Sequence, residues 1–420
     1  MRLFERNSKY FSFILLGMYL FYIGMMLHEY IYIDSKWSRV LSLVGLFAFL
    51  GGSLKIRKSI SGCDKQIKTT YYILLIVCLF HIMIGLLFYK EPISLLLFHP
   101  KYLWLFVIPM AFLLPVKFQY ISLLLRWSLV YALTSLAFSL YCFNDFFYNS
   151  EELMTSMIGW DAYVVNRPQE PAFLLYPIAA FSIIISQISR KWQIAISFAT
   201  VLAIGAGMMA GRRSATAILV ILLIVPILIK FFCVNKKIAF IGVILLLIGI
   251  SAIGISSNNI ENAFEEAFPI LANRMDQDSR SGVEEDFYKD MNDATDWVFG
   301  RGMNGTYKSP SVASIDKLHR TGIETGYLNI ILHGGLLMLI PYLVLLLYAS
   351  YKGFFCSSSL FLKGCAYYVF VHVLMLYPEG TPQLTLDYFI LFVFVRICVS
   401  KKWRNLSMQE IEKSILQNWE

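Results

Sequence analysis

Long apolar runs are the feature of this sequence that most limits the folds open to it. A helix needs roughly 20 residues to cross about 30 Å of hydrocarbon, and the runs are mostly of that length. They cover residues 11–33, 37–54, 69–89, 93–115, 118–141, 171–189, 192–210, 214–232, 238–256, 323–350, 364–378 and 383–399. We therefore predict an all-α polytopic membrane protein with about 12 transmembrane helices, in which residues 1–420 form a single integral membrane domain.

Composition excludes the common soluble classes of protein. Hydrophobic residues make up 58% of the chain and charged residues only 15%, whereas soluble domains carry about 25% charged residues. These values exclude a soluble globular enzyme and a disordered chain. The seven cysteines stand singly, without a Cys-x-x-Cys pair or a zinc-like spacing to histidine, so we expect neither a disulfide framework nor a metal site.

The net charge of +8 is arranged in the pattern of a membrane protein. If the N-terminus lies inside, 20 of the 36 lysines and arginines fall on inner segments. Basic residues are enriched on the cytoplasmic side of membrane proteins. We therefore predict that both termini are cytoplasmic, and that the positive charge sets topology and does not indicate a nucleic-acid partner.

This orientation leaves two long outer segments, a smaller loop at 142–167 and a large loop at 257–322. The large loop holds 12 of the 28 acidic residues. Apolar residues recur in it at helical spacing in two sets: Ile260, Phe264 and Phe268, then Val283, Phe287 and Met291. The second set follows Ser281 and Glu284, a pair spaced as in a capping box. We predict a partly helical outer loop with two amphipathic helices lying over the membrane face.

Polar groups at the outer ends of the apolar runs are candidates for a site, because isolated charges at bilayer depth are costly. Arg167 and Glu170 lie between prolines at the mouth of the 171–189 run. The prolines suit the first turn of a helix. A helix cap with a surface ion pair explains these two residues as well as a binding site does.

Arg212 and Arg213 are adjacent in a short outer turn between two apolar runs. The planar fork of arginine matches phosphate oxygens, and the start of the following helix adds free N–H groups. We predict that this turn binds a diphosphate headgroup. The alternative is contact with ordinary lipid phosphates.

The segment Gly300–Gly305 has the spacing G-x-G-x-x-G. A dinucleotide site is excluded here, because no strand precedes it and it lies outside the cytoplasm. Its glycines permit close approach of the backbone to a ligand, and Arg301 and Lys308 supply charge nearby. A plain loop turn is the alternative.

Four polar residues stand at the outer entry to the 323–350 run, and they are His319, Arg320, Glu324 and Tyr327. Glu324 could accept a proton from a sugar hydroxyl if partial burial raised its pKa from about 4.3. His319 competes for that role. A solvated carboxylate at a helix start is the alternative for Glu324.

Two of these segments resemble a known family. Gly300–Tyr307 followed by Ile323–Gly335 resembles the pattern before and into a late helix of Wzy-type polymerases of O-antigen and capsule repeat units. Arg167–Pro171 resembles the Arg/Glu-Pro element of that family, and Gly211–Ser214 its Ser-Arg-like turn. One position departs: O-antigen ligases and many relatives carry His-Asn where this chain has Glu324-Thr325.

The resemblance implies a GT-C-like, metal-independent membrane glycosyltransferase of the bacterial plasma (inner) membrane. It would join undecaprenyl-diphosphate-linked glycans without a cofactor, among membrane lipids and with a chain-length regulator protein as partner. The positions carried over from the family are Arg167, Glu170, Arg212, Arg213, Arg301, Arg320, Glu324 and Tyr327. In the reaction that we expect, Glu324 or His319 would accept the proton, Arg212 would act at the reacting diphosphate, and Tyr327 would stack on sugar. The residues expected to bind substrate are Arg167, Glu170, Arg213, Arg301, Arg320 and Lys308.

Three other functions stay open at this point. An O-antigen ligase would use the same donor with lipid A core as acceptor. A lipid-linked oligosaccharide flippase or transporter would need a central polar cavity and paired halves, whereas this chain concentrates its arginines outside. A glycolipid-binding protein without activity would keep the arginines but need no proton acceptor.

Overall fold

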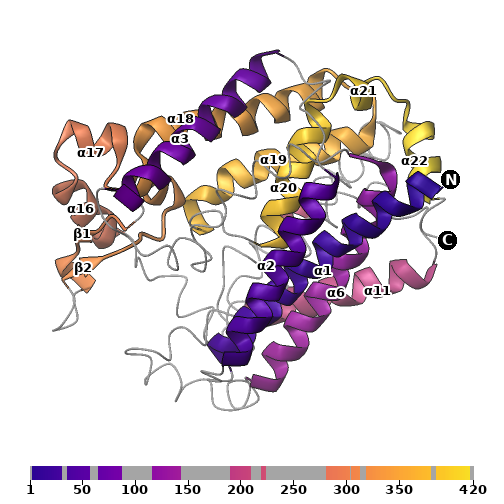
Figure 1. The fold of residues 1–420 in the computed structure, drawn as a ribbon, viewed down its shortest axis with the longest axis horizontal. Coiled ribbons are helices and arrows are strands. Elements are labelled where there is room, and N and C mark those ends of the chain that lie inside the picture. The colour runs from indigo at the N-terminus through magenta and orange to yellow at the C-terminus, as the bar shows by residue number, and fades with distance from the viewer. Residues whose placement is uncertain are drawn as a thin grey trace, which may run out of the picture. The chain divides into compact units, whose positions relative to one another are not determined.

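The structure is a computed structural model that describes residues 2–30, 36–56, 65–87, 116–142, 190–209, 219–223, 281–302, 304–312, 318–379 and 385–416 (Figure 1). The chain divides into two compact units. Unit 1 comprises Met1–Lys55, Lys117–Gln277 and Met408–Glu420, and unit 2 comprises Ile56–Val116 and Asp278–Ser407. The two units are described separately.

Among the described residues, five helices are long and apolar enough to cross a membrane. They are Trp37–Ile56, Lys65–Met83, Phe118–Phe138, Gly326–Phe355 and Leu360–Tyr377. Every predicted run with described residues is helical over most of those residues, so a mainly helical membrane protein is confirmed. The exceptions lie at the ends of two runs, at residues 323–325 and at residues 385 and 399. The predicted spans at 93–115, 171–189 and 238–256, and most of 214–232, lie outside the described residues.

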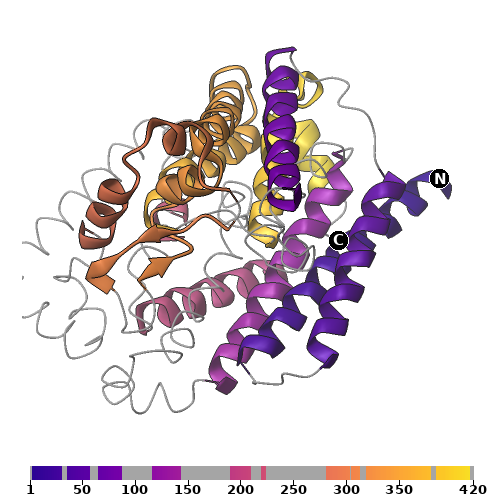
Figure 2. The same cartoon turned by 60° about the vertical axis from the view of Figure 1, so that its left-hand side comes forward.

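Unit 1 contains five described helices with defined bounds. They are α1 (Arg2–Tyr30), α2 (Lys36–Ile56), α6 (Phe118–Cys142), α11 (Arg190–Met209) and α22 (Met408–Leu416). Helices α1 and α2 lie side by side in both views (Figures 1 and 2). Their backbones approach closely at Gly17 and Gly45, where an added Cβ atom would lie 2.5 Å or less from backbone of the other helix. Small residues allow this close packing between membrane helices.

Unit 2 contains the remaining helices and a small sheet. They are α3 (Lys65–Leu87), α16 (Ser281–Asp290), α17 (Ala294–Phe299), β1 (Tyr307–Lys308), the 3₁₀ turn Pro310–Val312, β2 (His319–Arg320), α18 (Gly326–Phe355), α19 (Leu360–Glu379), α20 (Leu386–Cys398) and α21 (Lys401–Arg404). Helix α18 packs against α3 and α19, and α19 packs against α20. The core of this bundle includes Tyr342, Leu345 and Phe392, all almost fully buried.

Helix α18 is broken inside its length. Gly335 has φ +65° and ψ −172°, which is not helical, so α18 consists of a short first part and a longer second part. The helix also reaches Phe355, five residues beyond the predicted run. Only glycine adopts such a positive φ at little cost, so a break at this position depends on Gly335.

The second amphipathic helix of the large loop is confirmed as α16. Val283, Phe287 and Met291 are buried, and the Phe287 ring contacts Tyr307 and Trp297 at centroid distances of 5.3 and 6.1 Å. The apolar face of α16 is therefore covered by the loop's own residues, and the placement of this helix over the membrane face stays a prediction. The first predicted helix, at Ile260, Phe264 and Phe268, lies outside the described residues.

Candidate functional site

The described residues between 281 and 325, which we name the loop module, fold around the Phe287 ring. Helices α16 and α17, the β1–β2 ribbon and the 3₁₀ turn contribute to the module. Strands β1 and β2 pair antiparallel and lie side by side in Figure 2. The module leads directly into α18, and α17 packs extensively on that helix. The predicted site residues between Arg301 and Glu324 therefore belong to one folded element.

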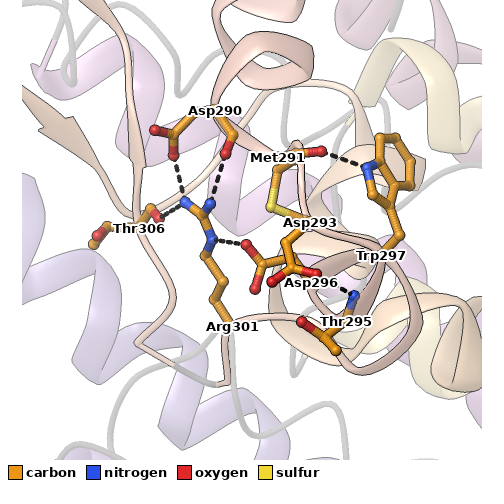
Figure 3. A network of polar contacts seen from close by, with 8 residues as sticks. All are labelled: Asp290, Met291, Asp293, Thr295, Asp296, Trp297, Arg301 and Thr306. Carbon is orange, nitrogen blue, oxygen red and sulfur yellow. Dashed lines mark hydrogen bonds and ion pairs between the residues drawn. The ribbon is translucent and has the colours of Figure 1, made fainter.

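Arg301 ties the loop module together (Figure 3). Its Nε donates to Asp296 at 2.8 Å, and Nη1 donates to the Asp290 carboxylate and to the Thr306 carbonyl. Its Nη2 donates to the Asp290 carbonyl at 2.8 Å, so four of the five guanidinium N–H bonds are engaged. Burial lowers the pKa of Arg301, but the bonds to Asp290 and Asp296 outweigh it and raise that pKa. A diphosphate at Arg301 would therefore compete with two carboxylates.

The glycines of the G-x-G-x-x-G segment meet the break in α18. Gly300 has φ +71°, and a Cβ atom there would lie 2.7 Å from the backbone nitrogens of Gly334 and Gly335. A Cβ atom at Gly335 would lie 2.1 Å from the Val298 carbonyl oxygen. The close approach that these glycines permit is thus made to the chain's own backbone. This observation favours the plain-turn reading of the segment over a ligand cradle.

Two hydrogen bonds fasten the turn to the broken helix. An interruption at Gly335 takes the preceding turn out of the regular hydrogen-bond ladder. The Arg301 backbone N–H donates to the Leu332 carbonyl at 2.7 Å, and His333 Nδ1 lies 3.1 Å from the Gly302 carbonyl oxygen. Irregular backbone at membrane depth is tolerated where protein covers it. The loop module supplies that cover at the break.

The β1–β2 ribbon separates the predicted site residues onto two faces. Its register pairs Tyr307 with Arg320 and Lys308 with His319. Because side chains alternate along a strand, paired residues share a face. Lys308 and His319 are exposed, whereas Tyr307 is buried and Arg320 is half-buried. The structure therefore groups Arg320 with Tyr307 and places the competing proton acceptor His319 beside Lys308.

Residues at the start of α18 are held by partners in α16 and α19. The Thr325 hydroxyl donates to the Glu284 carboxylate, and the Tyr327 hydroxyl donates to the Val373 carbonyl. Glu324 is exposed, so the partial burial on which its proton-acceptor role was predicted to depend is not present. Tyr327 is half-buried and linked to α19, which limits the ring surface that it can offer to a sugar.

The charges of Arg320 and Glu324 both affect the pKa of the Tyr307 hydroxyl. Burial raises the pKa of the Tyr307 hydroxyl, and the negative charges of Asp286 and Glu324 raise it further. The positive charge of Arg320 and a hydrogen bond with the Ser309 side chain lower that pKa. Asp286 accepts hydrogen bonds from Ser311 and Ser309, which hold the pKa of its carboxyl below the ordinary 3.8. The charges of Arg320, Asp286 and Glu324 thus all act on the buried Tyr307 hydroxyl.

An exposed aromatic surface lies on the same module. Tyr288 is 52% exposed and stacks on Trp297 with centroids 6.1 Å apart and planes 13° from parallel. Burial raises the pKa of Tyr288, and electrostatic interactions with Glu284 and with Tyr377 raise it further. Tyr377, near the end of α19, is 54% exposed. Flat aromatic faces beside a carboxylate suit a sugar, which presents both apolar ring faces and hydroxyls.

The other predicted arginines lie outside the described residues. These are Arg167, with its neighbour Glu170, and Arg212 and Arg213. The structure therefore brings together Arg320, Glu324 and, through Thr325, Glu284, and it leaves the predicted diphosphate turn a prediction. Within the described ranges, no group of three or more His, Cys, Asp or Glu is placed to hold a metal ion.

Two buried ionisable residues were not singled out by the sequence. Asp387 and His372 are 5% and 3% exposed within α20 and α19. Tyr368 contacts both residues, because its hydroxyl lies 3.4 Å from the backbone carbonyl oxygen of Asp387 and its ring centroid lies 4.3 Å from that of His372. Ionisable residues inside membrane helices are rare and costly. A single aspartate or histidine interrupting an apolar run was the available signal.

Comparisons with protein-family models, with curated proteins and with solved structures find no match to this chain. The resemblance to Wzy-type polymerases therefore stands on the quoted motifs. The function must be argued from the geometry of the loop module.

Proposed function

We propose that the protein is a membrane polymerase that joins undecaprenyl-diphosphate-linked oligosaccharide repeat units into O-antigen or capsular polysaccharide. The reaction would take place at the outer face of the bacterial plasma membrane. The observation that carries the proposal is that the charges of Arg320 and Glu324 both act on Tyr307 of one folded module, which also carries the stacked Tyr288 and Trp297 rings and leads into a membrane helix.

The proposed step needs two charged groups and an aligned acceptor. A sugar hydroxyl oxygen of the acceptor bonds to the anomeric carbon of the donor, and the bond from that carbon to the diphosphate breaks with its electron pair going to undecaprenyl diphosphate. Glu324 receives the hydroxyl proton as an exposed carboxylate that a substrate can reach, and no longer as a partly buried one. Arg320 stabilises the charge that grows on the diphosphate. His319 is the weaker candidate for the proton, because it lies on the opposite face of the ribbon from Arg320.

The aromatic surface of Tyr288 and Trp297 would align the acceptor sugar with the donor. Holding donor and acceptor in a reactive geometry can remove much of the entropic barrier to a two-substrate reaction. Tyr288 and Trp297 form one platform, and Glu284 can accept hydrogen bonds from sugar hydroxyls beside it. Arg212 and Arg213 are proposed to hold the diphosphate of one lipid-linked substrate.

A transporter of lipid-linked oligosaccharides is a second candidate, and the break in α18 favours it. Discontinuous membrane helices often form the substrate site of transporters. In this chain, however, Arg301 and Gly302 of the loop module bond to the turn at the break. A site formed by the break would have to displace those contacts, so the polymerase is the better supported function.

The proposal is tested by glycan analysis in the host bacterium after deletion of the gene. We expect one repeat unit per lipid anchor in the deletion strain and long chains after complementation with the wild-type gene. Glu324→Gln and Arg320→Ala should fail to restore long chains, whereas Arg320→Lys, which keeps the charge without the planar fork, should restore them weakly. The matched control is Glu285→Gln, because Glu285 is an exposed carboxylate on α16 that pairs with Lys289.

Each of the other functions predicts a different glycan. Long chains in the deletion strain would contradict a polymerase. Long chains that remain on the undecaprenyl carrier and never reach lipid A core would indicate a ligase. Repeat units that accumulate on the cytoplasmic side would indicate a transporter.

A further inference from the structure

The last turn of α17 leaves large apolar side chains uncovered. Val298 is 38% exposed and Phe299 is 46% exposed. The exposed residues at the start of the same helix, Ala294 and Thr295, are small or polar. Single apolar side chains on a surface need no explanation, so the place of this pair decides its meaning. A Cβ atom at Gly335 would lie 2.1 Å from the Val298 carbonyl oxygen and 2.6 Å from the Phe299 nitrogen. The apolar end of α17 therefore lies level with the break in α18.

Beyond the break, α18 carries a stripe of exposed apolar side chains that begins two residues after Gly335. Its members follow one another at intervals of three or four residues, and they are Leu337, Ile340, Val344, Leu347, Tyr351 and Phe355. Residues at this spacing lie on one face of a helix. Because α18 is long and apolar enough to cross a membrane, acyl chains are what would cover this face.

The far end of the stripe indicates how deep in the membrane the break lies. The Lys352 ammonium lies 5.3 Å from the Tyr348 ring centroid and 5.9 Å from that of Tyr351. Tyrosines beside a lysine are typical of the boundary between hydrocarbon and water. Sixteen residues separate Tyr351 from Gly335, so the helix rises about 24 Å between them, less than the roughly 30 Å of the hydrocarbon region. The break therefore lies just inside the opposite boundary.

Helix α3 gives a second measure of the same depth. It packs against α18, and the His81 ring forms a hydrogen bond with the Gly334 backbone. Thirteen residues, or about 20 Å of helix, separate His81 from Lys68, the last basic residue before the apolar part of α3. Past His81 the helix continues with exposed apolar side chains, for Met83 is 57% exposed and Leu87 is 64% exposed. Both helices thus place the break within the hydrocarbon region.

We propose that the last turn of α17 is embedded in the lipid bilayer, with the Val298 and Phe299 side chains among the acyl chains of phospholipids beside the break in α18. The depth of the break favours lipid, because an uncovered apolar group within the hydrocarbon region meets acyl chains. A second copy of this chain is disfavoured, since two side chains present far less than the roughly 800 Å² per partner of a stable protein interface. The bilayer would thereby hold the loop module at a fixed height, independently of the proposed function.

The first experiment maps contacts in the full-length protein, reconstituted into vesicles of phosphatidylethanolamine and phosphatidylglycerol. Benzoylphenylalanine, which cross-links to nearby C–H bonds under ultraviolet light, replaces Phe299, Ile340 or Ala294, one at a time. Ile340, on the stripe, is the positive control, and Ala294, exposed at the start of α17, is the matched negative control. We expect lipid adducts at Phe299 within about threefold of the yield at Ile340, and a yield at Ala294 about tenfold lower.

The second experiment compares hydrogen exchange of α17 in the same vesicles and in lipid-free amphipol. In wild type the vesicles should slow exchange by roughly tenfold, because acyl chains remove the exposed part of the Phe299 ring from water. Phe299→Ser should abolish this difference. Leu318→Ser is the matched control, since Leu318 is 47% exposed beside β2 and its replacement should leave the difference unchanged.

Three outcomes would overturn the proposal. A cross-linked protein dimer at Phe299 without lipid adducts would assign the turn to a second copy of the chain. A lipid yield at Phe299 as low as that at Ala294 would place the turn in water. Equal exchange of wild-type α17 in vesicles and amphipol would have the same consequence. Neither experiment contains a lipid-linked glycan, so both test this inference separately from the proposed function.

Discussion

The loop module and the helix bundle of unit 2, formed by α3, α18, α19 and α20, are held together by different forces. The bundle buries large apolar side chains such as Leu345, Leu346 and Phe392. The module has a small apolar core around Phe287 and depends in addition on directional polar contacts, chiefly those of Arg301 and Asp286. One continuous segment therefore passes from the loop module, whose stability depends on charged groups, into the bundle, whose stability depends on the volume of buried side chains. The two regions are in contact at the break in α18, where the backbone of Gly300 approaches Gly334 and Gly335.

The largest effect should come from removing volume in the bundle. Phe392→Ala leaves a cavity in a fully buried position, and such changes cost about 4 kcal/mol of unfolding free energy. We expect this loss in detergent unfolding curves, with little dependence on pH. Phe355→Ala is the control, because Phe355 is 78% exposed at the end of α18. Equal losses from both variants would contradict the assignment of the core.

The contact at the break is tested by Gly335→Ala. The residue would have to keep φ near +65° with its Cβ 2.1 Å from the Val298 carbonyl oxygen. Strain and overpacking together should cost about 3 kcal/mol and release α17 from α18. Faster proteolysis of the loop module would report the release. Gly51→Ala is the control, since an added Cβ there meets open space; protection equal in both variants would mean that the break does not hold the module.

A smaller loss is expected from Arg301→Ala. This variant removes charge-assisted hydrogen bonds to Asp290 and Asp296 and should cost about 2 kcal/mol, because the guanidinium is only partly shielded from solvent. Hydrogen exchange in α16 and α17 should rise while exchange in α19 stays unchanged. Lys289→Ala removes only an exposed ion pair and should leave stability almost unchanged. A change confined to substrate affinity would instead assign Arg301 to ligand binding.

The smallest expected effect is a pH dependence confined to the module. The pKa of Asp286 is held below 3.8 by hydrogen bonds, so its stabilising contribution is complete above about pH 4 and is lost as the pH falls through the lowered pKa. Hydrogen exchange of α16 should therefore accelerate at acidic pH in wild type. The acceleration should be weaker in Asp286→Asn and retained in Glu285→Gln. Identical acid sensitivity of α16 and α19 would remove the distinction between the two regions.

The two regions also differ in how far the sequence predicts them. Apolar runs mark the bundle helices, since a span is a local property of about 20 residues. The spacing of Val283, Phe287 and Met291 likewise predicts α16. The cover over that apolar face could not be predicted, because Tyr307 and Trp297 reach it only after the loop closes. The partners of Arg301 and the exposure of Glu324 are long-range properties of the same kind.

Short elements of secondary structure are predicted even less well by the sequence. Strands of two residues, such as β1 and β2, show no period, so the sequence could not place His319 and Arg320 on opposite faces. The adjacent Gly334 and Gly335 did mark a weak point in a helical run. Their contact with Gly300 required the fold, because it joins segments more than thirty residues apart.

The central claim is that the loop module catalyses transfer of one lipid-linked glycan onto another. It is tested most directly by giving the purified protein a single lipid-linked repeat unit in vesicles and counting both products. Our account predicts a ladder of longer glycans, with one undecaprenyl diphosphate released for each new glycosidic bond. A wild-type protein that binds or moves the lipid-linked unit while releasing no undecaprenyl diphosphate would contradict it.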